Sequence, residues 1–159
     1  MKLKSILFTF SISLLALGLL IVFSAPAAAS KTATADKDAD FWFDKGALCA
    51  TYGNDRAAIK YFQKAISLDP NRSGAYFEQG VSYAQLGEYD KGLALINKAL
   101  AMQPQNGLYL YGRGRVYLLA GEKEKAMEDF KKAAALDDED AQNYLEHLAS
   151  NEEVMAGDE

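Results

Sequence analysis

Glycine, alanine, proline and apolar positions recur along this chain with a period of 34 residues, between residues 46 and 138. Five positions of the repeating unit, here called registers, recur in this way. Two registers always hold glycine and a third always holds alanine. The fourth holds proline, proline and then aspartate, and the fifth, two positions before it, holds an apolar residue each time. Five registers that agree at one period are the signature of a repeat array built from short helical units. They are Gly46, Gly80 and Gly114; Gly53, Gly87 and Gly121; Ala65, Ala99 and Ala133; Pro70, Pro104 and Asp138; and Leu68, Met102 and Leu136.

Each unit predicts two helices joined by a tight turn. The first helix carries a large residue, a small one four positions later and another large one three further on. This spacing places all three on one face, which we expect to be buried against the second helix. A glycine inside a helix costs stability, but it lets the partner helix approach closely. A second glycine then ends the helix, where positive φ is needed. The three faces are Trp42, Gly46 and Cys49; Tyr76, Gly80 and Tyr83; and Leu110, Gly114 and Tyr117.

A 34-residue period built on helix-turn-helix units resembles the tetratricopeptide-repeat (TPR) family from Ala39 to Asp140. The resemblance implies an all-α fold, a right-handed α-solenoid of three TPR helix-turn-helix units with a C-terminal capping helix. Tyr144 continues the first-helix pattern, but Leu148 replaces the glycine and no partner helix follows, as expected of a terminal cap. The predicted segments are repeats at 39–72, 73–106 and 107–140, a capping helix at 141–150 and an acidic tail at 151–159.

The amino-terminal segment predicts export. Lys2 and Lys4 precede an uncharged apolar run at residues 6–23, and A-x-A cleavage sites follow, so residues 1–29 read as a signal peptide. The alternative is a retained signal anchor, because this run of 18 residues can nearly span a bilayer. Residues 30–38 form a polar linker. The expected location is outside the cytoplasm, periplasmic if the source is bacterial, or membrane-anchored through residues 6–23.

Composition narrows the function further. The net charge is −5, and loss of Lys2 and Lys4 with the signal would bring it to −7, which disfavours nucleic-acid binding. One cysteine, Cys49, and one histidine, His147, exclude an intramolecular disulfide and clusters of cysteine or histidine ligands. His147 has no serine or cysteine nucleophile near it in any repeat register. We therefore expect no enzyme activity, no metal and no cofactor, with membrane contact only through a retained amino-terminal segment.

The family resemblance implies a ligand groove lined by first-helix residues. Phe43, Phe77 and Tyr111 are 34 apart and predict an exposed aromatic row, and Ala47, Val81 and Arg115 predict the next row. Such a strip suits an extended peptide or an amphipathic helix, and Arg115 suits a ligand carboxylate. In the alternative, the rings pack between neighbouring first helices and fill the groove, and Arg115 pairs with Glu78 or is solvated.

One subset of the family binds acidic chaperone C-termini through a clamp of lysines, asparagines and an arginine. The corresponding positions here hold other residues, so the clamp is absent: Phe43, Ala47, Glu78, Leu108 and Gly112. The sequence thus predicts a non-catalytic protein–protein interaction adaptor or scaffold with an unidentified protein or peptide partner. The alternatives are a membrane-tethered structural or self-associating subunit of an envelope complex, and an accessory factor that presents a substrate to a hydrolase.

Overall fold

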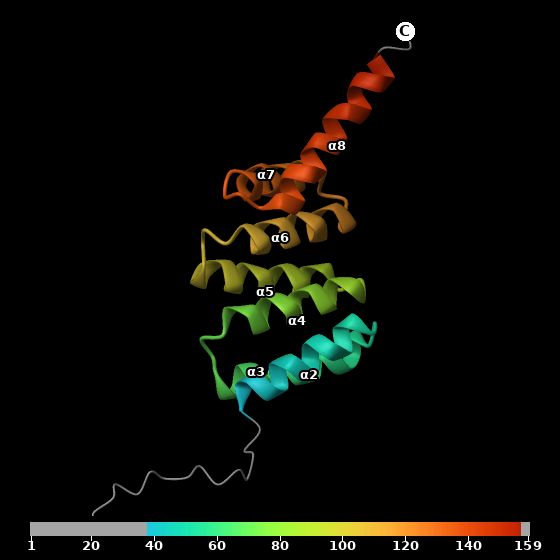
Figure 1. Ribbon diagram of the computed structural model, residues 1–159. Coiled ribbons are helices and arrows are strands. Elements are labelled where there is room, and N and C mark those ends of the chain that lie inside the picture. The colour runs from blue at the N-terminus through green and yellow to red at the C-terminus, as the bar shows by residue number, and fades with distance from the viewer. Residues whose placement is uncertain (1–37, 157–159) are drawn as a thin grey trace, which may run out of the picture. The chain divides into compact units, whose positions relative to one another are not determined.

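The computed structural model describes residues 38–156, which form α-helices and no strand (Figure 1). The predicted signal peptide, the alternative anchor at residues 6–23 and most of the linker lie outside the described residues. Within 38–156, no helix is both long and apolar enough to cross a membrane. The helices are α2 (Ala39–Thr51), α3 (Asp55–Leu68), α4 (Ser73–Gln85), α5 (Tyr89–Met102), α6 (Gly107–Leu119), α7 (Lys123–Ala134) and α8 (Glu139–Ala156).

The helices pack as consecutive pairs. α2 packs on α3, α4 on α5 and α6 on α7, and each pair contacts the next through its second helix and the following first helix. The first helices also contact one another directly, α2 with α4 and α4 with α6. Figure 1 shows the pairs stacked in chain order, with α8 packed after α7. This arrangement confirms the prediction of an all-α repeat solenoid.

The predicted turn glycines follow the first helices, and side-chain caps begin several of the helices. Gly53, Gly87 and Gly121 follow the first helices with φ values of 72°, 80° and 84°, as the repeat pattern predicts. At the helix N-termini, Asn54 and Asp138 act as caps: their side-chain oxygens accept hydrogen bonds from the backbone N–H of Ala57 and Ala141, at 3.3 and 2.9 Å. These local signals mark the helix ends where they occur, whereas α4, α5 and α7 begin without a side-chain cap.

The predicted close-approach glycines lie where a large core side chain of the partner helix is packed. A Cβ atom placed on Gly46, Gly80 or Gly114 would lie 2.6–2.7 Å from Phe62, Ile96 or Phe130. All three of these large side chains are 0% exposed. The helices of each pair therefore approach so closely that no side chain fits at the glycine.

Two expectations are corrected by the structure. The last helix begins at Glu139 and extends to Ala156, so it is longer than the predicted cap at 141–150 and includes most of the predicted acidic tail. Acidic residues in its first turn favour its start, and no glycine or proline follows before Gly157. Cys49, expected to be buried against α3, is only partly buried, as are the equivalent Tyr83 and Tyr117.

Candidate functional site

An open groove runs between the first helices α4 and α6, with a cavity volume of about 230 Å³. Its walls are mostly apolar, and α8 contributes one residue where it begins. The groove thus uses first helices from two successive repeats, whereas the sequence predicted a surface lined by the first helices of all three. Its lining comprises Phe77, Glu78, Val81, Ala84 and Gln85 of α4; Leu108, Tyr111, Gly112, Arg115, Val116 and Leu119 of α6; and Asp140 of α8.

Phe77 forms part of the floor of this groove and not an exposed surface. Its side chain is only 6% exposed and stacks on Tyr109 of α6, with ring centroids 4.6 Å apart. The Tyr109 hydroxyl lies 3.1 Å from Oγ of Ser73, a buried hydrogen bond that joins α6 to the start of α4. The expectation of an exposed ring at Phe77 is therefore wrong, because this ring packs between two neighbouring first helices.

The other two rings of the predicted row pack on the second helix of their own repeat. Phe43 lies 5.6 Å from Phe62, and Tyr111 lies 5.5 Å from Phe130, between ring centroids. The guanidinium of Arg72 covers Phe43 at 4.2 Å from its ring centroid. Both rings remain partly exposed, but only Tyr111 lines the groove.

The structure brings together four of the six residues predicted from the sequence, namely Phe77, Val81, Tyr111 and Arg115. Phe43 and Ala47 lie on α2 and do not line this groove. Leu108 and Leu119, which are 51% and 53% exposed, add apolar surface near the two ends of α6. That these residues contact a ligand stays a prediction.

Three charged side chains line the groove, and none of them forms an ion pair or a hydrogen bond with a described residue. They are Glu78, Arg115 and Asp140. The expected alternative pairing of Arg115 with Glu78 is therefore not formed. Arg115 is exposed, and its guanidinium lies 5.9 Å from the ring centroid of Tyr111. Glu78 is half-buried, and desolvation raises the pKa of its carboxyl group above the usual range.

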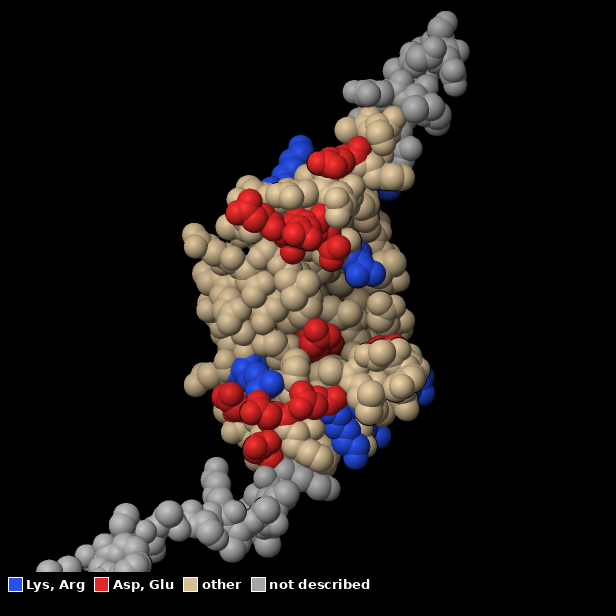
Figure 2. Space-filling model, in the orientation of Figure 1, with Lys and Arg blue, Asp and Glu red and all other residues tan. Residues whose placement is uncertain are grey.

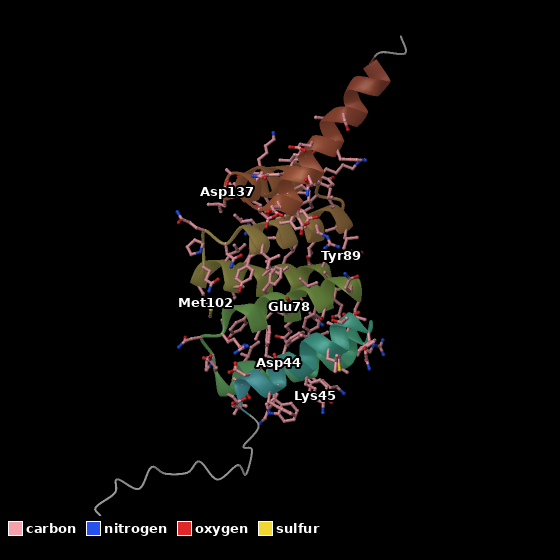
Figure 3. All side chains as sticks on the ribbon, viewed as in Figure 1. Asp44, Lys45, Glu78, Tyr89, Met102 and Asp137 are labelled. Atoms are coloured by element: carbon pink, nitrogen blue, oxygen red, sulfur yellow. The ribbon has the colours of Figure 1, made fainter. Side chains whose placement is uncertain are left out.

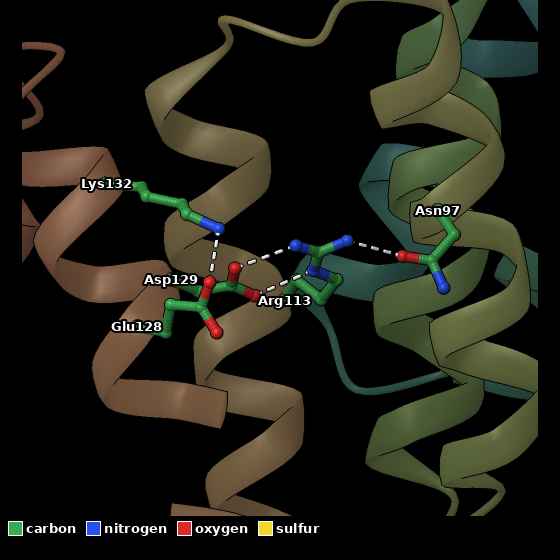
Figure 4. Close-up of polar contacts among 5 residues, drawn as sticks. All are labelled: Asn97, Arg113, Glu128, Asp129 and Lys132. Atoms are coloured by element: carbon green, nitrogen blue, oxygen red, sulfur yellow. Dashed lines mark hydrogen bonds and ion pairs between the residues drawn. The ribbon is translucent and has the colours of Figure 1, made fainter. Parts of the chain in front are cut away.

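The sequence interpretation missed a polar network between α5, α6 and α7 (Figure 4). Arg113 donates to both carboxylate oxygens of Asp129, at 2.7 Å each, and to the side-chain oxygen of Asn97, at 2.6 Å. Asp129 is 2% exposed, and its hydrogen bond raises the pKa of Arg113. Because these groups are engaged by protein partners, we assign the network to holding α6 and α7 of the third repeat together and to joining α6 to α5 of the second repeat.

Residues 38–156 contain no group of three or more His, Cys, Asp or Glu side chains placed to hold a metal ion. His147 lies exposed on α8. What the described surface offers is an apolar groove with a few charges, which suits binding more than acid–base or metal chemistry.

Two tetratricopeptide-repeat family models match the chain, at residues 39–72 and 77–143, which together are more than half of its length. With the paired helices, the turn glycines and the groove between first helices, this match shows that the chain belongs to the tetratricopeptide-repeat family. No curated protein sequence matches the chain.

Solved structures with the same fold include MamA, YrrB and the first TPR domain of Spaghetti (RPAP3). MamA is 27% identical with a TM-score of 0.57, over 66% of this chain and 57% of its own. YrrB, described as a TPR protein with an unusual peptide-binding site, is 23% identical with a TM-score of 0.63, over 70% of this chain and 58% of its own. The RPAP3 domain, bound to the HSP90 peptide SRMEEVD, is 20% identical with a TM-score of 0.64, over 72% of this chain and 92% of its own. This chain therefore spans less than two thirds of the MamA and YrrB structures.

Proposed function

We propose that this protein is a non-catalytic interaction adaptor that binds a peptide segment of a partner protein in the groove between α4 and α6. The observation that carries the proposal is the exposed apolar surface of this groove. Leu108 and Leu119 are about half exposed. They lie eleven positions apart on α6, which corresponds to about 16 Å at 1.5 Å per residue. Exposed apolar surface of this extent beside a concave floor is typical of a protein-binding site.

The structural relatives support peptide binding in general but not one kind of peptide. YrrB and the RPAP3 domain are each described with a peptide site or a bound peptide. The RPAP3 ligand is acidic, whereas this groove presents Glu78 and Asp140 and lacks the clamp residues expected for acidic C-termini. We therefore do not assign an acidic chaperone peptide to this protein.

We further propose that the repeats work outside the cytoplasm, in the periplasm if the source is bacterial. The support is the sequence of residues 1–29, with its lysines, its apolar run and its A-x-A sites. A retained anchor at residues 6–23 would place the same groove beside a membrane. Amino-terminal sequencing of the purified protein distinguishes the two, because cleavage gives a chain that begins near residue 30.

The groove is tested by affinity capture from an extract of the source organism's envelope, with captured proteins identified by mass spectrometry. The double variant Leu108→Ser/Leu119→Ser removes exposed apolar surface at the groove. The matched control, Leu68→Ser/Leu136→Ser, removes leucines that are 48% and 38% exposed, at the end of α3 and just after the end of α7. Phe77→Ala would not test binding, because that ring is buried and its loss would destabilise the fold.

A partner that is retained by the control and lost by the groove variant is the result that the proposal predicts. A hydrolase as that partner would support the accessory role among the alternatives. Equal capture by both variants would contradict binding in the groove, because it would place the contact on another surface.

Self-association is a second candidate, and the exposed outer face of α2 favours it. Leu48 is 58% exposed and Tyr52, directly after the helix, is 81% exposed. Sedimentation equilibrium of the wild-type chain and of Leu48→Ser/Tyr52→Ser tests this candidate. A larger species that dissociates in the variant would support it, and a monomer at all concentrations would rule it out.

A further inference from the structure

We infer that the partner segment carries a lysine or arginine beside an apolar side chain, and that the carboxylate of Glu78 binds this cation. The inference rests on the proposed binding function of the groove and adds the chemical nature of the ligand. It follows from the charges that the groove leaves without partners.

Glu78 is the only charged residue of α4. It is half-buried on the groove wall beside apolar residues, and no described residue forms an ion pair or hydrogen bond with it. Taking a carboxylate partly out of water without a partner is unfavourable, which is the cause of its raised pKa. A cation delivered by a ligand would compensate this carboxylate in a partly dry site, where a charge-assisted hydrogen bond is stronger than at an open surface.

The neighbouring charges on the first helices favour the same ligand. Asp44 of α2 occupies the position 34 residues before Glu78, and Figure 3 shows these two carboxylates on successive first helices. Asp140 at the start of α8 also lines the groove. Figure 2 shows acidic clusters over the start of α2 and over the junction of α7 and α8, with a largely uncharged belt between them.

Only one cation, Arg115, lines the groove, against the two carboxylates. Three other described cations are engaged away from the groove: Lys91 and Lys125 pair with Glu88 and Glu122 near the turns, and Lys98 lies over Tyr76. The groove is thus apolar with a net negative charge. A segment that alternates apolar and basic side chains complements it, and an acidic segment is repelled.

The experiment is a selection of random twelve-residue peptides, displayed on phage, on the purified full-length chain in a non-ionic detergent. Parallel selections use Glu78→Gln and the matched control Glu124→Gln. Glu124 is an exposed glutamate in the first turn of α7, so both variants lose one negative charge and attract cations non-specifically to the same degree. The most enriched peptide is then synthesised and titrated by fluorescence anisotropy against these three proteins and against Leu108→Ser/Leu119→Ser.

We expect peptides that combine lysine or arginine with leucine, isoleucine or an aromatic residue. Glu78→Gln should weaken the best peptide roughly tenfold, the usual effect of losing a hydrogen bond between charged groups. Glu124→Gln should change its affinity less than about twofold, as expected for a screened surface charge. Enriched peptides without basic residues, or equal affinities for the two variants, would overturn the inference and leave the groove function standing. Peptides that bind Leu108→Ser/Leu119→Ser as well as wild type would overturn the groove function itself.

Discussion

The ring of Phe77 on α4 lies against the backbone of Gly112 on α6. A Cβ atom placed on residue 112 would lie 2.5 Å from two carbons of this ring, closer than any real Cβ contact. The missing side chain at Gly112 therefore lets the aromatic floor of the groove sit between the two first helices. The distance between α4 and α6, and with it the groove, depends on this contact.

Gly112→Ala should destabilise the protein. The added methyl group must displace Phe77 from its stack on Tyr109, and overpacking of this kind costs about 1–3 kcal/mol. The helix gains about 1 kcal/mol from the change of glycine to alanine, so we expect a net loss near 1 kcal/mol in the free energy of unfolding, measured in urea.

The control for this variant is Gly74→Ala in α4. A Cβ atom at Gly74 would lie 3.6 Å from the Tyr109 hydroxyl, which is an ordinary contact. We expect it to stabilise the protein by about 0.4–1 kcal/mol through the unfolded state. A gain of stability in both variants would show that Phe77 moves freely and would contradict the tight floor described here.

Glycine at position 87 is required by backbone conformation and not by lack of space. No atom lies within 4 Å of a Cβ placed there, but the φ angle is 80°. Gly87→Ala should cost about 1–2 kcal/mol in the free energy of unfolding, since alanine disfavours positive φ. Gly87→Asn should cost less, because asparagine tolerates this conformation. Equal stability of the alanine variant and the wild type in urea would contradict a conformational role for this glycine.

Substitutions in the Arg113 network should lower the stability of the fold more than most other substitutions outside the groove. Arg113→Ala leaves Asp129 buried and unpaired, and breaking a buried ion pair in this way costs about 3–5 kcal/mol. Thermal unfolding should show a large fall in Tm, with no comparable change for Lys132→Ala, whose pair with Glu128 is on the surface (Figure 4). Similar small effects for both variants would mean that Asp129 finds another partner.

Glu78 predicts a specific pH dependence. Burial raises the pKa of its carboxyl group above that of the unfolded chain, so the folded state binds this proton more tightly. The free energy of unfolding therefore falls as this carboxyl group ionises. The fall begins near about pH 4.3, the usual glutamate pKa, and continues as the pH rises through the raised pKa of the folded state.

Glu78→Gln should remove this cost. The gain in the free energy of unfolding over wild type should increase from about pH 4 to pH 7 in urea titrations. Arg115, Asp140 and Asp44, the other charges on this face, are common to both proteins. A gain that is independent of pH, or greater stability of the wild type at neutral pH, would contradict an uncompensated carboxylate.

The fold could be predicted from the sequence because its causes are local and repeated. Gly46, Gly80 and Gly114 each face a large core residue, and the turn glycines each take positive φ, so one pattern was seen three times. The length of α8 was not predicted, because this helix occurs once and its end is not part of the repeating pattern. Only caps and charges indicate where it begins and ends.

The site was predicted only in part, for two physical reasons. The repeat position of Phe77 indicates the groove, but its burial depends on Gly112. The equivalent positions of the first and second repeats hold Asp44 and Glu78, so this glycine is not repeated. The Arg113–Asp129 pair also occurs in one repeat alone, since the equivalent residues of the second repeat are Gln79 and Leu95. Features that break the period have no repeated signal, and they are set by tertiary packing.

The most direct test of the central claim is site-specific photocrosslinking in the source organism. The photoreactive residue p-benzoylphenylalanine replaces Leu119, which is exposed at the groove, or Leu68, which is exposed at the end of α3. The account predicts a light-dependent adduct with a partner protein from position 119 and none from position 68. An adduct from position 68 alone, or the same adduct from both positions, would contradict binding in the groove between α4 and α6.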